Sequence, residues 1–316
     1  MSQLPDRVFV RAPAKINLFL EILGQRPDGY HDLRSIVVPI SVCDSVVLEK
    51  IASGIELIIK DQGAANGSAL KDDRPDRNLA VRAAAALKDA TGYAGGARIH
   101  LEKCIPVGGG LGGGSADAAA VLMGLNDLWQ SGLSRETLMK IGLRLGCDIP
   151  ALVRSGAVCM AGVGDRVQPL PIGASQSGRE WWLVVANPGF GVSTRDIYAR
   201  HRGSLTSASP RYTSMCFALE TGDIQLAARS LFNGLQDTVC RKYPLIELLV
   251  EGLVRSGAAG AMVSGSGASV FGLAADEADA RRIAVRAPAV FGFPVWLRVA
   301  RVLPDGVMVA HGPLEA

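Results

Sequence analysis

The segment PVGGGLGGGSADAAA, residues 106–120, constrains this chain more than any other, because six of the seven residues 108–114 are glycine. Glycine has no Cβ atom, so other groups can approach the backbone closely there. The segment follows the strand-like stretch ARIHLEK (97–103) and leads into a helical pattern whose apolar residues share one face between 121 and 128. A glycine loop between a strand and a helix N-terminus favours an anion, because backbone N–H groups converge there and the helix dipole is positive. The sequence therefore predicts a phosphate-binding loop.

Two common nucleotide-binding motifs do not account for this loop. Gly108, Gly110 and Gly113 match GxGxxG, but the acidic residue that would bind a dinucleotide ribose does not follow at the end of a second strand. Gly114 stands where the P-loop pattern requires a lysine. Phosphate binding is still favoured over a glycine loop without a ligand, and Ser115 is the candidate for a hydroxyl donor or a Mg²⁺ ligand.

The composition excludes several classes of protein. The chain has 316 residues, of which 48% are hydrophobic and 20% charged, as in an ordinary soluble enzyme. The formal net charge is +3 and the basic residues are scattered, which argues against nucleic acid as the main partner. The uncharged stretch 256–275 is rich in glycine and serine, so we expect a buried strand, a loop and a second strand there instead of a membrane span.

The cysteines indicate a reducing compartment. They form no CxxC pair, and no histidine lies at metal-ligand spacing from them. No signal peptide is recognisable, so a cytoplasmic protein is expected. We predict free, mostly buried thiols at Cys43, Cys104, Cys147, Cys159, Cys216 and Cys240.

Periodicity and capping residues predict the secondary structure. Helices are expected at 79–91 between Asn78 as N-cap and Gly92, and at about 115–128, 134–146, 216–231, 243–257 and 277–287. Strands are expected at 16–22, 55–59, 97–103, 181–188 and 295–302, with apolar strand-like pieces between glycines at 147–167. Strand groups mixed with helices, without strict βαβ alternation, predict an α+β fold. We place a domain boundary near residue 165, giving domains 1–165 and 166–316.

Two more segments accompany the glycine loop, RAPAKINLFLEI (11–22) and SGSGASVFG (264–272). In this order and spacing, the three segments resemble the motifs of the GHMP kinase superfamily over nearly the whole chain. The segments PAKINLFLEILGQRPDGYHDL (13–33), LGCDIPALV (145–153) and NPGFGVST (187–194) are similar to the superfamily members of the non-mevalonate isoprenoid pathway that act on 4-diphosphocytidyl-2-C-methyl-D-erythritol.

The resemblance implies a fold and a reaction. The fold would join an ATP-binding N-terminal domain, like ribosomal protein S5 domain 2, to a ferredoxin-like substrate-binding C-terminal domain, with the site in the cleft between them. The reaction would be ATP-dependent phosphorylation of the 2-hydroxyl of the methylerythritol moiety. Alternatives are another kinase of the superfamily, of the homoserine or mevalonate type, or a ligand-binding protein on the same fold without catalysis.

The resemblance assigns catalysis to Lys15 and Asp148. Asp148 would act as the base toward the acceptor hydroxyl, and Lys15 would keep that carboxylate ionised and favour alkoxide character. The residues alone leave both roles open. Asp148 precedes Pro150 by two positions, just past a helix end, and is equally explained as the N-cap of the next helix. Lys15 could simply be a strand lysine whose head group reaches solvent.

Two sets of binding residues also follow from the resemblance. Those expected at the nucleotide are Asn78, Pro106, Val107, Gly108, Gly109, Gly110, Leu111, Gly112, Gly113, Gly114, Ser115 and Ala116. Those expected at the cytidyl substrate are Asn17, Tyr30, His31, Lys103, Asp148, Thr194, Tyr198, Gly265 and Gly267. The aromatic residues would stack on cytosine, and the lysine would contact the diphosphate.

Ala116 departs from the common form of the second motif, which carries a second serine there. A hydroxyl at that position is therefore dispensable or supplied elsewhere, and a metal-ligand role belongs more safely to Ser115. No protein-built metal site is expected, and Mg²⁺ would arrive with ATP, held largely by phosphates and water. The expected partners are the two small-molecule substrates, with no nucleic acid or membrane, and the protein would be a monomer or weak homodimer.

Overall fold

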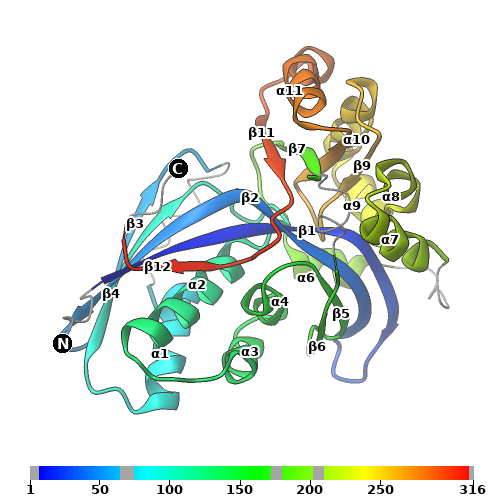
Figure 1. Ribbon diagram of the computed structural model, residues 1–316. Coiled ribbons are helices and arrows are strands. Elements are labelled where there is room, and N and C mark those ends of the chain that lie inside the picture. The colour runs from blue at the N-terminus through cyan, green and yellow to red at the C-terminus, as the bar shows by residue number, and fades with distance from the viewer. Residues whose placement is uncertain (1–6, 65–74, 172–179, 202–209, 313–316) are drawn as a thin grey trace.

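The computed structural model describes residues 7–64, 75–171, 180–201 and 210–312 (Figure 1). A long antiparallel hairpin organises the fold, formed by β1 (Arg7–Gln25) and β2 (His31–Ile51). Its two strands run from the first sheet past the second half of the chain, where they curve away together (Figure 1). The predicted turn at RPDGYH joins them.

Within the described residues, the first sheet has eight strands, in the order β12-β1-β2-β4-β3 with three more at its side. The remaining strands are β3 (Ile55–Asp61), β4 (Gly96–Lys103), β5 (Val158–Gly162), β6 (Arg166–Pro169), β8 (Phe232–Asn233) and β12 (Met308–Ala310). β5 pairs with β2, and β8 pairs in parallel with β1. Residues from the end of the chain thus complete the first sheet.

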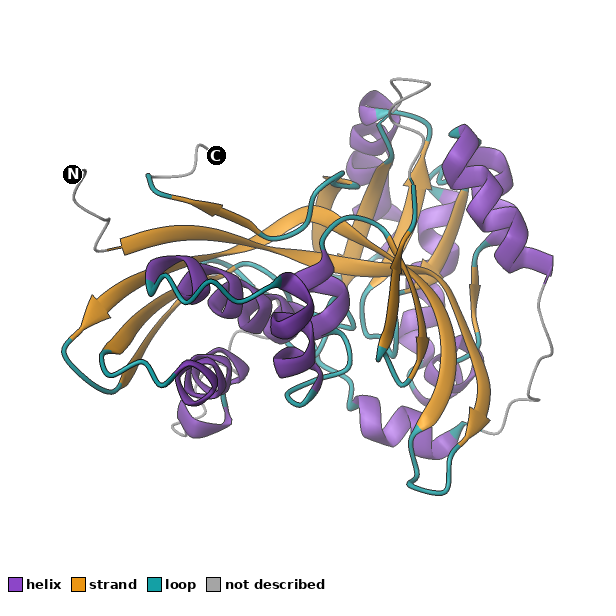
Figure 2. Ribbon diagram, turned by 60° about the horizontal axis from the view of Figure 1, so that its bottom comes forward, coloured by secondary structure: helices purple, strands orange, loops and turns teal. Residues whose placement is uncertain are grey.

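Four helices cover one face of this sheet (Figure 2), namely α1 (Leu79–Thr91), α2 (Gly113–Leu128), α3 (Arg135–Leu143) and α4 (Ile149–Arg154). α2 lies in the middle and is buried almost all round, as its alanine-rich sequence allows. A Cβ atom at Gly124 would lie 2.5 Å from Leu48 Cδ1, so this helix packs directly on the strands. The position of α2 therefore fixes where the glycine loop ends.

The second sheet is antiparallel, with the order β11-β7-β10-β9. Its strands are β7 (Trp182–Asn187), β9 (Gly260–Val263), β10 (Val270–Ala274) and β11 (Trp296–Arg301). The helices of this half are α6 (Thr194–Arg200), α7 (Pro210–Thr221), α8 (Ile224–Ser230), α9 (Gln236–Lys242), α10 (Pro244–Arg255) and α11 (Glu277–Phe291). A short 3-10 helix, η2 (Pro75–Arg77), precedes α1.

Most predicted elements are confirmed. Asn78 caps α1 by accepting a hydrogen bond from Ala80 N, and Gly92 ends it in the left-handed conformation at φ 67°. The stretch 256–275 contains β9 and β10 with a turn between them, as predicted. No helix in the described part of the chain combines the length and the apolar character that crossing a bilayer requires.

Four predictions need correction. The stretch 147–167 does not consist of strand-like pieces only: Ile149–Arg154 is helical, because Pro150 stands in the first turn, where its missing N–H costs nothing. The helix expected at 216–231 is two helices, since Gly222 adopts φ 75° and Asp223 caps a new start. The helix after the glycine loop begins at Gly113, before Ser115.

The fourth correction concerns the thiols. All six cysteines are free, as predicted, but only Cys240 is buried and the other five are half-buried. The domain boundary near residue 165 stays a prediction. The sheets do not divide at a single point of the chain, because β6, β8 and β12 all belong to the first sheet.

Candidate active site

A cavity of about 1280 Å³ brings most of the predicted site residues together. The glycine loop, β1, the hairpin turn, α6 and the SGSG turn all contribute to its wall. The predicted residues that line it are Lys15, Asn17, Tyr30, His31, Asn78, Lys103, Pro106, Val107, Gly108, Gly109, Gly110, Gly112, Gly113, Gly114, Ser115, Asp148, Thr194, Tyr198 and Gly265. Leu111, Ala116 and Gly267 do not line it, and the first two are buried in the hydrophobic core.

Lys15 and Asn17 occupy neighbouring inward positions on β1 and are almost fully buried. The pairing with β2 shifts register between Pro13 and Lys15 and again after Asn17, and such bulges re-aim side chains. Lys15 Nζ donates to Asn17 Oδ1 at 2.7 Å, and Asn17 Nδ2 donates to Ser35 Oγ at 2.8 Å. The Ser35 hydroxyl in turn donates to the carbonyl of Phe19 at 2.7 Å. This chain of hydrogen bonds fixes the direction of the Lys15 ammonium.

Asp148 faces Lys15 from the turn before α4. Its Oδ2 atom lies 3.5 Å from Lys15 Nζ, and its side chain is 33% exposed, so one side of the carboxylate is open to the cavity. Asp148 occupies the N-cap position of α4 but has helical dihedral angles, φ −82° and ψ −18°, and makes no capping hydrogen bond. The capping interpretation left open by the sequence is therefore wrong for the side chain, and the carboxylate is available for a ligand.

The glycine loop packs against the SGSG turn of the second sheet. Gly109 O accepts from Ser269 N at 2.9 Å, and Gly110 O accepts from Ser264 Oγ at 3.1 Å. A Cβ atom at Gly109 would lie 2.7 Å from Ser269 Oγ. Glycine is therefore required at these positions because the SGSG turn packs directly against the backbone. Gly114 differs, because a Cβ there would meet only a side-chain atom at 3.5 Å, an ordinary contact.

Both glycine segments also enclose Lys15. Lys15 N donates to Leu111 O at 2.9 Å, and a Cβ at Gly112 would lie 3.0 Å from Lys15 Cγ. Gly265, at φ 56°, would place a Cβ 3.2 Å from Lys15 Nζ. The first, second and third sequence motifs therefore meet at one ammonium group.

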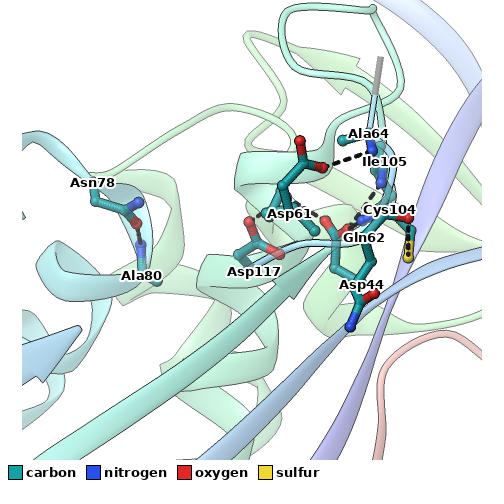
Figure 3. A network of polar contacts seen from close by, with 10 residues as sticks. Asp44, Asp61, Gln62, Ala64, Asn78, Ala80, Cys104, Ile105 and Asp117 are labelled. Atoms are coloured by element: carbon teal, nitrogen blue, oxygen red, sulfur yellow. Dashed lines mark hydrogen bonds and ion pairs between the residues drawn. The ribbon is translucent and has the colours of Figure 1, made fainter. Parts of the chain in front are cut away.

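Lys103, the last residue of β4, is almost fully buried and lies between two buried carboxylates, those of Asp44 and Asp117, which are labelled in Figure 3. Its Nζ donates to Asp117 Oδ2 at 2.6 Å and to Asp44 Oδ2. The other oxygen of Asp44 accepts from Cys104 N at 2.6 Å and Ile105 N at 2.9 Å. The other oxygen of Asp117 is buried and has no hydrogen-bond partner in the described structure.

The charges of this cluster are coupled. Burial alone would lower the pKa of Lys103, but Asp117 and Asp44 outweigh it and raise that pKa. Burial raises the pKa of Asp117 to about 8, against the opposing effect of Lys103 and with a further contribution from Asp44. The cluster therefore combines one ammonium with two carboxyl groups, of which that of Asp117 holds its proton more tightly than a free aspartate does.

Aromatic side chains form the far end of the cavity. The rings of His31 and Tyr198 lie 5.2 Å apart between centroids at an interplanar angle of 47°. Tyr30, in the hairpin turn, is 59% exposed at the same end. Burial, with the charges of Asp148 and Cys147, raises the pKa of the Tyr198 phenol, so this side chain stays neutral. Planar neutral surfaces of this kind suit a nucleobase.

Three functional residues were not predicted from the sequence, namely Ser35, Asp44 and Asp117. The alternation of β2 contained a signal for Asp44, because Val42, Asp44 and Val46 all point to the buried face. An acid in a row of inward apolar residues requires a cation nearby. For Ser35 and Asp117 no comparable signal was present, since serine and aspartate are unremarkable at a strand end and in a helix's first turns.

Comparison with known proteins places the chain in a family. The model of the GHMP kinases N terminal domain matches residues 78–161, and that of the GHMP kinases C terminal domain matches residues 218–292. The 4-diphosphocytidyl-2-C-methyl-D-erythritol kinase of Symbiobacterium thermophilum is 41% identical over 279 residues, which cover 88% of this chain and 94% of that protein. The enzyme of the same name from Citrifermentans bemidjiense is 39% identical over 86% of this chain and 91% of that protein.

Comparison with solved structures finds the same family. A crystal structure of 4-(cytidine 5'-diphospho)-2C-methyl-D-erythritol kinase matches with a TM-score of 0.75 at 32% identity, covering 93% of this chain and 99% of that one. Homoserine kinase from Cytophaga hutchinsonii matches with a TM-score of 0.75 at 18% identity, covering 98% of this chain and 99% of that one, and this likeness concerns the fold alone. The chain belongs to the GHMP kinase superfamily and, within it, to the family of the 4-diphosphocytidyl-2-C-methyl-D-erythritol kinases.

Proposed function

We propose that the chain transfers the γ-phosphoryl group of ATP to the 2-hydroxyl of 4-diphosphocytidyl-2-C-methyl-D-erythritol, giving the 2-phosphate and ADP. One observation carries the proposal: the pair Lys15–Asp148 lies in a single cavity with the glycine loop and with the aromatic residues of the hairpin turn and α6. A kinase for this substrate needs a phosphate site, a group that accepts a proton and a nucleobase site in one space.

Asp148 takes the proton of the acceptor hydroxyl in this proposal. Its carboxylate is partly open to the cavity, and the ammonium of Lys15 lies 3.5 Å from its Oδ2 atom. The same ammonium stabilises negative charge that develops on the attacking oxygen. Because phosphoryl transfer passes through a loose transition state, positioning by these two groups contributes as much as proton removal.

The start of α2 and the glycine loop hold the triphosphate. Backbone N–H groups at the helix start have no partners within the helix and carry its positive dipole end. Gly112, Gly113 and Gly114 line the cavity there, and Gly114 has the most open surroundings. Asn78 caps α1 through its side-chain oxygen, which leaves its amide N–H₂ for the adenine contact that the resemblance implies.

Mg²⁺ is proposed to arrive with ATP. The residues near the glycine loop fit this ion, because Ser115, which carries a hydroxyl oxygen, lines the cavity and Mg²⁺ prefers oxygen ligands. Among the described residues no cluster of three or more His, Cys, Asp or Glu side chains could hold a metal alone. When bound, the ion neutralises charge on the phosphate oxygens.

The nucleobase is proposed to stack at the aromatic end, between Tyr198 and the Tyr30–His31 turn. This feature favours the cytidyl substrate over the acceptors of homoserine and mevalonate kinases, which have no ring to stack. A reducing cytoplasm is the proposed location, which the six free cysteines support.

A coupled assay of ADP release tests the proposal. The wild-type protein with ATP and Mg²⁺ is given 4-diphosphocytidyl-2-C-methyl-D-erythritol, mevalonate or homoserine in parallel, and the phosphorylated carbon is identified by NMR. We expect turnover with the cytidyl substrate only, at the 2-hydroxyl. Faster turnover of mevalonate or homoserine would refute the proposed substrate. ADP release without a phosphorylated product would refute the proposed reaction.

A further inference from the structure

The cations that line the cavity differ in how they are neutralised. They are Lys15, Arg77, Lys103 and Arg195. Lys15 is paired with Asp148, and Lys103 is held between two carboxylates. Within the described part of the chain, neither arginine has a carboxylate within ion-pair distance. Arg77 lies beside Asn78 at the nucleotide end, whereas Arg195 lies in α6 at the other end.

The acid adjacent to Arg195 is already engaged. Asp196 accepts from Arg200 Nε at 2.9 Å and pairs with Lys242. The hydrogen bonds from Lys242 and Arg200 lower the pKa of Asp196. This carboxylate is therefore ionised and is already paired with those two cations. Arg195 therefore presents an uncompensated guanidinium to the cavity.

The neighbours of Arg195 in α6 connect the nucleobase end of the cavity with the catalytic pair. Tyr198 follows it by three residues, so both side chains share one face of α6. Thr194, directly before it, has its Oγ1 atom 2.8 Å from Ser266 Oγ, and the neighbouring Gly265 abuts Lys15 Nζ. Passing from Tyr198 to Thr194 thus leads from the aromatic end to the ammonium of Lys15.

The proposed substrate has the same order of groups. Its diphosphate joins the cytidine to the methylerythritol, so it must lie between the stacked base and the acceptor hydroxyl. A guanidinium is suited to such a group, because its planar fork donates two hydrogen bonds to phosphate oxygens at once. We propose that Arg195 binds the diphosphate of the cytidyl substrate and so contributes to the choice of substrate. This inference rests on the proposed function.

Lys103, to which the resemblance gives this contact, is placed differently. A Cβ at Gly113 would lie 3.5 Å from Lys103 Nζ, so the ammonium is at the start of α2 on the nucleotide side. Its hydrogen bonds to Asp44 and Asp117 hold it there. Arg195 is exposed and makes no such bond to a carboxylate of the described residues, which leaves it available to an arriving anion.

Calorimetric titration of cytidine, CMP and CDP tests the assignment. The proteins are wild type, Arg195→Ala, Arg195→Lys and the control Arg241→Ala, which removes an exposed arginine of α9 that pairs with exposed Asp237. Arg195→Ala should weaken CDP binding about tenfold or more and cytidine binding less than about twofold, because only phosphate contacts are lost. Arg195→Lys should restore part of the CDP affinity, and the control should match wild type.

Two outcomes separate this inference from the proposed function. If wild type binds CDP well and Arg195→Ala binds it equally, the assignment of Arg195 is wrong while the kinase proposal stands. If wild type binds none of the three ligands, the nucleobase site and the proposed function fail together with it. With the complete substrate, Arg195→Ala should raise KM by a larger factor than it lowers kcat, and the reverse would indicate a role in the chemical step.

Discussion

Gly110 and Ser264 lie so close together that a Cβ atom on Gly110 would be 2.2 Å from the carbonyl oxygen of Ser264. The two residues belong to the glycine loop and to the turn between β9 and β10, so this contact joins the two sheets at the cavity. The loop that the sequence predicts to bind phosphate therefore has two roles. Its first three glycines allow protein to pack on protein, whereas Gly114, at the start of α2, lines the cavity with room for a ligand.

Alanine substitutions at Gly110 and Gly114 should separate these roles. Gly110→Ala should lower the free energy of unfolding by about 4 kcal/mol or more or prevent folding, because φ is +76° and the new Cβ collides with backbone. Gly114→Ala should leave the melting temperature nearly unchanged and weaken binding of a non-hydrolysable ATP analogue. Thermal unfolding measures the stability of the two variants, and titration measures their binding of the ATP analogue. Equal melting temperatures for the two variants would contradict the packing role of Gly110.

Asp148→Asn should lower kcat by a factor of about 100 or more and leave ATP binding nearly intact, since the amide cannot accept the proton but keeps the shape. Steady-state kinetics with the cytidyl substrate and titration with an ATP analogue provide the measurements. Asp89→Asn, at an exposed position of α1, is the matched control and should behave as wild type. Turnover at the parental rate in Asp148→Asn would refute the base assignment.

Ser35→Ala should affect catalysis through Asn17 and Lys15. The hydroxyl is fully buried and its loss removes a hydrogen bond from the Asn17 amide and one to the Phe19 carbonyl, which should cost about 1–3 kcal/mol of stability. The ammonium of Lys15 then loses its fixed direction, so kcat should fall more than KM for ATP rises. Ser45→Ala, at an exposed position of the same strand, controls for the change of residue type. Unchanged kcat together with the lost stability would limit Ser35 to a structural role.

The stability of the protein should depend on pH through Asp117. Its pKa is about 8 in the folded chain against 3.8 for an unperturbed aspartate, so the native state keeps a proton that the unfolded chain has released. The free energy of unfolding should therefore decrease as pH rises from about 4 toward 8. Asp117→Asn keeps an oxygen acceptor for Lys103 and removes this slope, so its melting temperature relative to wild type should increase between pH 5 and 9.

Thermal unfolding of wild type, Asp117→Asn and the control Asp89→Asn over this pH range makes the comparison. Asp89→Asn should run parallel to wild type. A difference between wild type and Asp117→Asn that stays constant with pH would show that Asp117 is ionised throughout.

The sequence predicts the elements whose ends carry a local signal. α1 lies between Asn78 and Gly92 because both residues make the capping contacts that their types favour. The split between α7 and α8 was missed, although Gly222 and Asp223 are such signals, because the surrounding apolar pattern runs on without interruption. Capping residues thus predict where a helix ends only when the apolar periodicity also changes at that position.

The site depends on contacts that spacing does not reveal. Lys15 and Asp148 meet because a bulged strand and the turn before α4 pack on the same glycine loop, and nothing in either segment alone indicates the other. The resemblance to a family brought them together, and the structure agrees with that pairing. Neither the sequence pattern nor the resemblance predicted the ion pairs of Lys103. Predicting them requires knowing that Asp44 and Asp117 face the same space.

The pairing of β12 with β1 has a consequence for how the molecule is made. Residues Phe9, Val10 and Arg11 pair with Met308, Val309 and Ala310, which are synthesised long after them. The edge of the first sheet at this part of β1 therefore stays unpaired on the ribosome until the second half of the chain has been made.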